Sequence, residues 1–384
     1  MGSYAFDPDR INGCVIWEGM MKQLYLFLAM LVFLFSCWVG LSLARNKSLW
    51  NDEVYSQVST IGGHGYLDLI EGRVSEGNNG PFYYLVQKFA GQVFGYEIPK
   101  GVVASGTYVD QKAQLILRIS PVVWMSLAIA LIFYYFSINV ALWAGLCAWL
   151  MTMSTFMVWS FWAEARPYSL LFLLTTVQSF LVLSCQDSSQ RSRSLRGLIL
   201  THILLAFAAP GSIVQIVWVS GLFLLFGYGK KRDLVMMAMI PVFICFYYYN
   251  QTPKFPVTFP DAPWKLITAN FPIERLLLVG AAGIYLWRKE ACRLGAVFYP
   301  GMMLMAAMMM LLIFKIKAGP GAGYLMDGRH FIFLAPVGII VSTFVLVRLM
   351  ESSRSWVIQR IFLLLLIALA IPRIWKYLHL FNLR

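Results

Sequence analysis

The chain has 384 residues, of which 59% are hydrophobic and only 13% are charged. A soluble globular domain carries about twice that share of charged residues, so the composition excludes an ordinary soluble protein and indicates a polytopic membrane protein. The net charge of +13 is spread over short loops and forms no single basic patch. This pattern favours membrane topology and lipid headgroups as the cause of the charge, and nucleic acid is not expected as a partner.

The cysteines are scattered, with neither a CxxC motif nor zinc-ligand spacing, so no disulfide framework and no zinc site is predicted. The first apolar run has no small-residue cleavage site after it and is followed by Arg45 and Lys47. We therefore interpret it as a retained anchor and not as a signal peptide. Residues 1–23 are a mixed polar extension, and residues 24–384 are predicted to form a single transmembrane domain.

A transmembrane helix needs about 20 apolar residues, and this rule predicts an all-α polytopic membrane protein with about eleven spans. The predicted spans are Leu24–Leu43, Leu115–Phe136, Asn139–Phe156, Tyr168–Cys185, Gly197–Ala209, Ser212–Tyr228, Leu234–Tyr249, Phe271–Trp287, Leu294–Phe314, Phe331–Met350 and Trp356–Ile371. Residues 44–114 form a long first outer loop between the first two spans. Within it, Phe82–Phe94 is too short to span a membrane and is typical of an amphipathic helix in the interface.

Loop charge predicts the orientation, because short cytoplasmic loops concentrate Lys and Arg. Basic clusters fall on one side of the predicted topology: Arg191/Arg193/Arg196, Lys230/Lys231/Arg232, Arg288/Lys289/Arg293 and Arg348/Arg354. The opposite side then receives residues 44–114, the turn Glu164–Tyr168, a proline-rich loop and the loop Lys315–Arg329. This assignment depends on Gly197–Ala209 crossing the membrane, since the second half inverts if that short segment does not cross.

Three polar elements meet on this outer face: Asp52-Glu53, then Glu164 with Arg166 and Tyr168, then Asp327 with Arg329 and His330. An ionised group at membrane depth costs about 2.5–3.5 kcal/mol on insertion scales, so such groups usually have partners or functions. Simpler explanations stay open for each element. Asp52-Glu53 could be a solvated loop, Glu164 and Arg166 an interfacial ion pair, and Arg329 a snorkelling side chain.

The outer loop that holds Lys315, Lys317 and Arg329 is basic although it faces away from the predicted cytoplasm. An anionic ligand such as a lipid phosphate would account for this charge, because Arg suits bidentate phosphate contact and Lys acts as a point charge. A carboxylate beside a phosphate-binding patch favours group transfer from a phosphate-linked carrier. Asp52 would deprotonate the acceptor, and the cations would stabilise the departing phosphate.

The order of these motifs resembles that of the membrane glycosyltransferases of the GT-C superfamily, and within it the bacterial relatives of protein O-mannosyltransferases and aminoarabinose transferases. The motifs are Asn51-Asp52-Glu53 after the first span, Asn79-Gly80-Pro81-Phe82-Tyr83-Tyr84, Glu164-Ala165-Arg166-Pro167-Tyr168 after the third span, and Gly328-Arg329-His330 before a late span. The order of spans and loops is similar over about residues 20–350, whereas residue identities match only in these motifs. The family often has His-Pro-Pro where Asn79-Gly80-Pro81 stands, and Tyr where His330 stands.

The resemblance implies a GT-C-like fold with juxtamembrane helices at Tyr66–Ile70 and Phe82–Phe94. It also implies a polyprenyl-phosphate sugar as donor, and an active site on the periplasmic face of a bacterial inner (plasma) membrane. The acceptor would be a lipid, a glycan or a protein. The sugar itself is not identified.

By the same resemblance, Asp52 is the catalytic base, with Glu53 beside it orienting the acceptor or a metal. Glu164, Arg166 and Tyr168 would line the active site, and Arg329 with His330 would lie near the donor phosphate. Tyr83 and His64 complete the candidate substrate-binding residues, although a lone loop histidine is more often simply solvated.

Asp52, Glu53 and Glu164 are hard oxygen ligands that could hold a divalent metal ion, and no other cofactor is predicted. Two other functions compete with the enzyme. A lipid or glycan transporter or flippase would place charged or helix-breaking residues near the middle of paired spans, whereas here they lie at outer ends and in outer loops. A non-catalytic assembly subunit would keep the fold but would not need Asp52.

Overall fold

The structure is a computed structural model of the whole chain. It describes residues 8–49, 51–74, 79–96, 111–185, 187–251, 257–258, 324–325, 332–352 and 356–381. This part of the chain is helical except for one short parallel pair, in which β1 (Val257–Thr258) lies beside β2 (Tyr324–Leu325). The predicted spans Phe271–Trp287 and Leu294–Phe314 lie outside the described residues.

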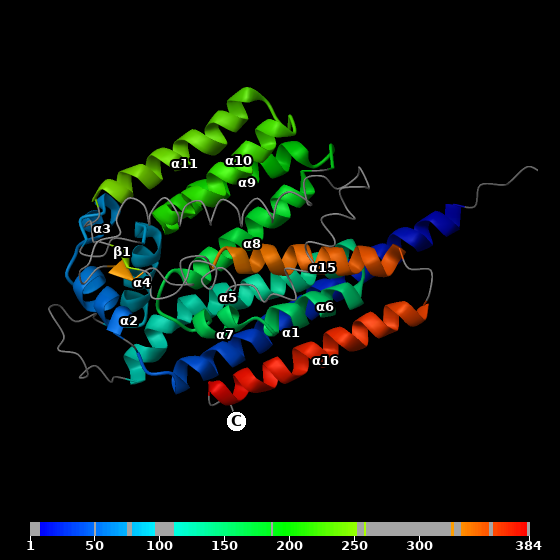
Figure 1. Cartoon of the computed structure of the whole chain (residues 1–384), viewed down its shortest axis with the longest axis horizontal. Helices are drawn as coiled ribbons and strands as arrows, with labels where there is room; N and C mark the ends of the chain where they lie inside the picture. Colours follow the sequence, from blue (N-terminus) through cyan, green and yellow to red (C-terminus); the bar gives the residue numbers. More distant parts are fainter. Residues whose placement is uncertain are drawn as a thin grey trace, which may run out of the picture.

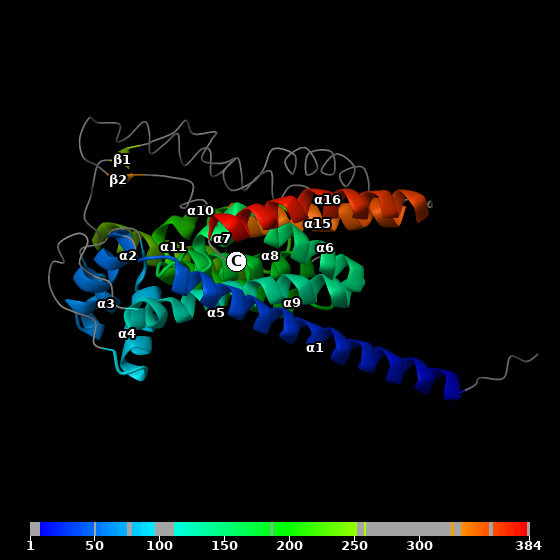
Figure 2. The ribbon, with the colours of Figure 1, turned by 90° about the horizontal axis from the view of Figure 1, so that it is seen from below.

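The long helices run side by side in a bundle (Figure 1). They are α1 (Pro8–Asn46), α5 (Gln111–Asn139), α6 (Leu142–Met153), α8 (Tyr168–Ser184), α9 (Arg191–Ala208), α10 (Ile213–Leu225), α11 (Lys231–Gln251), α15 (Leu334–Ser352) and α16 (Trp356–Leu380). Short helices connect or cap them: α2 (Asn51–Tyr55), the π-helix η1 (Ser56–Gly62), α3 (Tyr66–Glu71), α4 (Pro81–Val93), α7 (Phe156–Phe161) and the 3₁₀-helix η2 (Pro210–Ser212). Helix α1 begins at Pro8, inside the segment predicted as an extension, and its N-terminal half leaves the bundle (Figure 2).

Four helices in the described part of the chain are long and apolar enough to cross a membrane. They are Gly19–Asn46, Gln114–Asn139, Lys231–Gln251 and Leu363–Leu380, and shorter apolar helices occur at Leu142–Met153, Tyr168–Ser184, Pro210–Leu225 and Leu334–Phe344. The prediction of an all-α chain with membrane-length apolar helices is therefore confirmed for the described residues. The total of about eleven spans stays a prediction.

The third predicted span, Asn139–Phe156, is wrong as a single helix, because it breaks after Met153 into α6 and α7. Side chains cause the break. The hydroxyl groups of Ser154 and Thr155 donate hydrogen bonds to the carbonyl oxygen of Met151, at 3.1 and 2.8 Å. Such local bonds compete with the helical backbone pattern and end helices. Hydropathy does not reveal this break, since the residues on both sides of it are mainly apolar.

Helix α9 is longer than the predicted segment Gly197–Ala209, because it begins at Arg191. Its far end contacts the first outer loop, where the backbone N–H of Gly80 donates to the carbonyl oxygen of Ala208 at 2.8 Å. At its near end, the Arg191 guanidinium lies 4.7 Å from the ring centroid of Tyr228, in the turn that precedes α11. Helix α9 therefore runs from the basic turns, which are the segments around Arg191 and residues 230–232, to the first outer loop.

Helices α2, α3 and α4 gather at one end of the bundle in both views (Figures 1 and 2). Helix α11 also reaches this end, because the Tyr248 hydroxyl donates to the carbonyl oxygen of Ile70 at 2.7 Å. The neighbouring Tyr247 hydroxyl donates to the carbonyl oxygen of Glu71 at 3.2 Å. The first outer loop thus caps the ends of α9 and α11, opposite the basic turns.

The contact between Gly80 and α9 leaves no room for a side chain. A Cβ atom at Gly80 would lie 2.0 Å from the carbonyl oxygen of Phe207. We therefore predict that Gly80→Ala lowers the stability of the protein by about 3 kcal/mol, as expected for overpacking against rigid backbone. The thermal unfolding midpoint in detergent measures this loss. Gly221→Ala is the matched control, because a Cβ there meets nothing within 4 Å; equal midpoints for both variants would contradict the close approach.

Candidate active site

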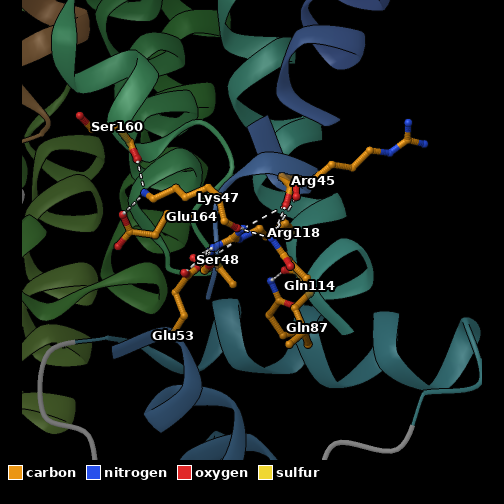
Figure 3. A network of polar contacts seen from close by, with 12 residues as sticks. Arg45, Lys47, Ser48, Glu53, Gln87, Gln114, Arg118, Ser160 and Glu164 are labelled. Atoms are coloured by element: carbon orange, nitrogen blue, oxygen red, sulfur yellow. Dashed lines mark hydrogen bonds and ion pairs between the residues drawn. The ribbon is translucent and has the colours of Figure 1, made fainter. Parts of the chain in front are cut away.

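A buried ion pair joins the first outer loop to α5. The Arg118 guanidinium donates from Nε to Oε1 of Glu53 at 3.0 Å and from Nη2 to Oε2 at 2.6 Å. Both side chains are 0% exposed. This bidentate, charge-assisted geometry is the strong form of an Arg–carboxylate contact, and Figure 3 shows it at the centre of a larger polar network.

The same guanidinium caps the C-terminal end of α1. Arg118 donates to the carbonyl oxygens of Ala44 at 3.1 Å and Ser48 at 2.9 Å, and also to that of Lys47. The Gln114 amide, one turn earlier on α5, donates to the carbonyl of Ala44 at 2.8 Å. The last carbonyls of a helix have no partner within the helix and carry partial negative charge. A guanidinium is therefore well suited to this position.

Glu53 also contacts the Glu164–Tyr168 turn. Its Oε1 accepts a hydrogen bond of 2.6 Å from the backbone N–H of Ala165, in the turn between α7 and α8. Both carboxylate oxygens of Glu53 are therefore engaged, by Arg118 and by this turn. Glu53 thereby joins α5 to this turn, and its predicted role beside Asp52, orienting the acceptor or a metal, stays a prediction.

Arg166 closes the contact between the two motifs. Its Nη1 donates to the carbonyl oxygen of Asp52 at 3.3 Å and to the hydroxyl of Ser56. Its guanidinium lies 6.0 Å from the ring centroid of Tyr168, the first residue of α8, and Arg166 is only 4% exposed. The predicted meeting of Asp52-Glu53 with the Glu164–Tyr168 turn is thus present in the structure.

Glu164 lies beside a lysine from the end of α1. The Lys47 ammonium is 3.7 Å from Oε2 of Glu164, and it donates a 3.1 Å hydrogen bond to the carbonyl oxygen of Ser160. The Glu164 side chain is buried, whereas that of Lys47 is 31% exposed. Figure 3 shows the Lys47 side chain extending toward Glu164 and that of Arg45 extending the other way.

Asp52 differs from its neighbour Glu53 in exposure. Its carbonyl oxygen accepts hydrogen bonds from Arg166 and, at 2.9 Å, from the Ser56 hydroxyl, so the backbone at this residue is fixed. Asp52 itself is partly exposed, while Glu53 is fully buried. Asp52 therefore combines a restrained backbone with a partly exposed position.

A π-helix follows Asp52 and Glu53 directly. Such helices are rare, and single turns of this type are frequent at functional sites. On η1, Gln57 is 1% exposed, and both polar atoms of its side chain have no hydrogen-bond partner within the described residues. A buried amide with unused donors and acceptors is uncommon in native structures and calls for a ligand or water to explain it.

His64 and Tyr83 lie in other contacts of the first outer loop. His64 lies two residues after the end of η1, with its Nδ1 at 2.8 Å from the carbonyl oxygen of Thr60. The Tyr83 ring is buried and lies edge-on to Tyr84 and to Trp124, at centroid distances of 5.6 and 6.2 Å. The described contacts of the Glu53–Arg118 network include neither residue, so their roles as substrate-binding residues stay predictions.

The third predicted element lies outside the described residues, and with it Lys315, Lys317, Arg329 and His330. The nearest described part of the same loop is β2 (Tyr324–Leu325), which lies with β1 at the end of the molecule where α2 and α3 gather (Figure 2). This is also the end that carries Asp52 and Glu53.

The proposed metal ligands do not form a metal-binding group in the described part of the chain. No group of three or more His, Cys, Asp or Glu side chains that could hold a metal is present among these residues. Glu53, one of the three predicted ligands, instead directs both oxygens at Arg118 and at the Ala165 N–H.

Four residues of this network were not predicted from the sequence: Lys47, Ser56, Gln114 and Arg118. A signal for Arg118 is present in the sequence, because it is a charged residue inside the predicted span Leu115–Phe136. Such a residue normally has a partner or a function. No comparable signal marks Ser56, whose contact with Arg166 depends on tertiary structure.

Comparison of the chain with protein-family models gives no match, and no curated protein matches it. The function therefore has to be inferred from the site, since a helical membrane fold by itself supports many activities.

The Glu53–Arg118 pair gives a direct stability prediction. Arg118→Ala leaves the Glu53 carboxylate buried without its cation, which costs about 3–5 kcal/mol in comparable cases. We expect a correspondingly large fall in the unfolding midpoint in detergent. Arg73→Ala is the control, because its ion pair with Glu71 is exposed and should contribute less than about 1 kcal/mol. If the two variants unfold alike, Arg118 does not hold this site together.

Proposed function

We propose that this protein is an integral-membrane glycosyltransferase that moves a sugar from a polyprenyl phosphate to a lipid, glycan or protein acceptor. One observation carries the proposal. Two motifs that are more than a hundred residues apart meet at the end of the bundle, and their contact fixes the backbone of a partly exposed Asp52. This is the geometry expected of a general base at a membrane surface.

The charges around Asp52 support this role. Glu53 is neutralised by Arg118, and Glu164 lies beside Lys47. Arg166 donates to the backbone carbonyl of Asp52. The neighbouring acidic groups are therefore matched by cations, and Asp52 remains the partly exposed carboxylate of the pair at the start of α2.

The reaction balances with these groups. The acceptor hydroxyl loses its proton to the Asp52 carboxylate while its oxygen forms a bond to the anomeric carbon of the sugar. The bond between that carbon and the phosphate oxygen breaks, and its electron pair leaves with the polyprenyl phosphate. A single displacement of this kind inverts the anomeric configuration. Cations that contact the leaving phosphate lower the barrier, because they stabilise charge that develops in the transition state.

The predicted phosphate ligands are Lys315 and Lys317, which precede β2 in the chain, and Arg329, which lies between β2 and α15 in the sequence. Sugar and acceptor hydroxyl groups need neutral hydrogen-bonding partners as well. The buried Gln57 amide lies in η1, which follows α2, and it offers both a donor and an acceptor. Hydroxyl groups of a ligand would satisfy both.

The membrane orientation belongs to the same proposal. The basic turns at Arg191 and Tyr228 lie at the end of the bundle opposite α2 and α3. Under the positive-inside rule the basic end faces the cytoplasm, so Asp52 would face the periplasm of a bacterial inner membrane. Polyprenyl-phosphate sugars would then be used on the outer side.

A transporter is the main competing function. Its charged groups would lie near the middle of the spans, where substrates and ions cross. Here the network joins the last turn of α1 to the first turns of α5, so the charges lie at helix ends. This placement favours surface chemistry over a pathway through the bundle.

Replacement of the proposed base tests the function. We expect Asp52→Asn to lower the rate of sugar transfer by about 100- to 10,000-fold, as for loss of a general base, with an unchanged unfolding midpoint. The measurement is release of polyprenyl phosphate and labelling of the acceptor fraction, with purified protein and a series of polyprenyl-phosphate sugars.

Asp68→Asn is the matched control in the same loop, because Asp68 is also partly exposed and accepts a 2.9 Å hydrogen bond from the Gly65 N–H at the start of α3. This variant should keep the wild-type rate. Normal transfer by the Asp52 variant would remove Asp52 from catalysis. Absence of any transfer by the wild-type protein, with every donor, would favour the assembly subunit.

A further inference from the structure

We propose that Lys47 is a substrate-contacting residue that binds the phosphate of the donor lipid on the Glu164 side of the site. The inference rests on the proposed function and extends it to a residue for which neither hydropathy nor the motifs predict a role. Its basis is the placement of one ammonium group, at the end of α1, beside the Glu164–Tyr168 turn.

Lys47 is anchored at its backbone. Its carbonyl oxygen accepts hydrogen bonds from both Arg118 and Gln114, and its backbone N–H donates to the carbonyl of Leu43 at 3.0 Å. The side chain then extends to Ser160, which lies in α7 and is remote in sequence. A lysine near a helix end usually snorkels into water, so an inward, pinned side chain needs another explanation.

The ammonium has bonding capacity left. A lysine carries three N–H donors, and Lys47 uses one in its 3.1 Å bond to the Ser160 carbonyl. The Glu164 oxygen at 3.7 Å is too far for a hydrogen bond and acts as a counter-ion. Within the described part of the chain, this leaves donors for a further oxygen, on a side chain that is 31% exposed.

The other two cations of the network are less suited to a ligand. Arg118 is fully buried and directs its donors at Glu53 and at three carbonyl oxygens. Arg166 is 4% exposed and donates to Asp52 and Ser56. Lys47 is the most exposed cation of the three, so it is the one best placed to contact a phosphate from the solvent or lipid side.

A simpler role for Lys47 is that of a counter-ion for the buried Glu164. The double variant Lys47→Met/Glu164→Gln separates the two roles, because it removes both charges together. If Lys47 is only a counter-ion of Glu164, the double variant should recover both the thermal stability and the lipid binding of the wild type. If Lys47 binds the phosphate, the double variant should recover the stability but not the binding.

The experiment measures binding of a C55 polyprenyl monophosphate to the purified protein in lipid nanodiscs by native mass spectrometry. Parallel samples contain the uncharged C55 polyprenol, phosphatidylglycerol, or inorganic phosphate as competitor. These distinguish a carrier phosphate from a bulk lipid headgroup and from a free phosphate ion. We expect the wild-type protein to prefer the polyprenyl phosphate over all three.

Lys47→Met should weaken this binding by about tenfold or more, as for loss of one charge-assisted hydrogen bond, and so should the double variant at normal thermal stability. Lys47→Arg should restore most of it. Arg45→Met is the matched control, because Arg45 is an exposed cation two residues away whose side chain points away from Glu164 (Figure 3), and it should bind as the wild type does.

Wild-type affinity in the double variant would overturn the role of Lys47 and leave the glycosyltransferase proposal standing. Equal weakening by Arg45→Met would also overturn it, since the effect would then be general attraction to a positive surface. A wild-type protein that does not distinguish polyprenyl phosphate from polyprenol would instead refute the lipid-phosphate donor itself.

Discussion

The candidate site depends on the buried bidentate contact between Arg118 and Glu53. Removing two charges from water is expensive, and their attraction offsets that cost only when the geometry is good and the remaining donors and acceptors are satisfied. Both conditions hold here. Arg118 donates to the Glu53 carboxylate and to the carbonyl oxygens of Ala44, Lys47 and Ser48, while Glu53 also accepts from the Ala165 N–H. The pair thereby joins α1, α2, α5 and the turn before α8.

This contact also explains how two adjacent carboxylates acquire different environments. Successive side chains on a helix point about 100° apart. When Glu53 turns inward to Arg118, Asp52 is directed elsewhere and remains partly exposed. The two adjacent carboxylates therefore differ in their contacts and in their exposure. One carboxylate holds the segment in place, and the other is presented at the surface on a backbone that Arg166 and Ser56 restrain.

Hydropathy predicted the helices that form the bundle, because apolar runs such as those of α1, α5 and α11 are long and distinct. The motifs predicted correctly that Asp52-Glu53 meets the Glu164–Tyr168 turn. The partner of Glu53 was missed, since a hydropathy window averages a single Arg118 into its apolar neighbours. The break at Ser154 and the early start of α9 at Arg191 were missed for a related reason. The break depends on individual side-chain contacts, and the first turns of α9 are polar, so an average over composition detects neither.

The balance of charge limits what the described network can do by itself. Its three carboxylates, Asp52, Glu53 and Glu164, are matched in number by Lys47, Arg118 and Arg166. In the proposed reaction Asp52 would activate a hydroxyl group, but this balanced cluster would offer no surplus of positive charge to an anionic leaving group. A phosphate-linked donor therefore requires cations from another segment in addition to Lys47. In the proposed reaction, Lys315, Lys317 and Arg329 would supply that positive charge together with the partly exposed Lys47, so acceptor activation and donor binding would depend on separate parts of the sequence.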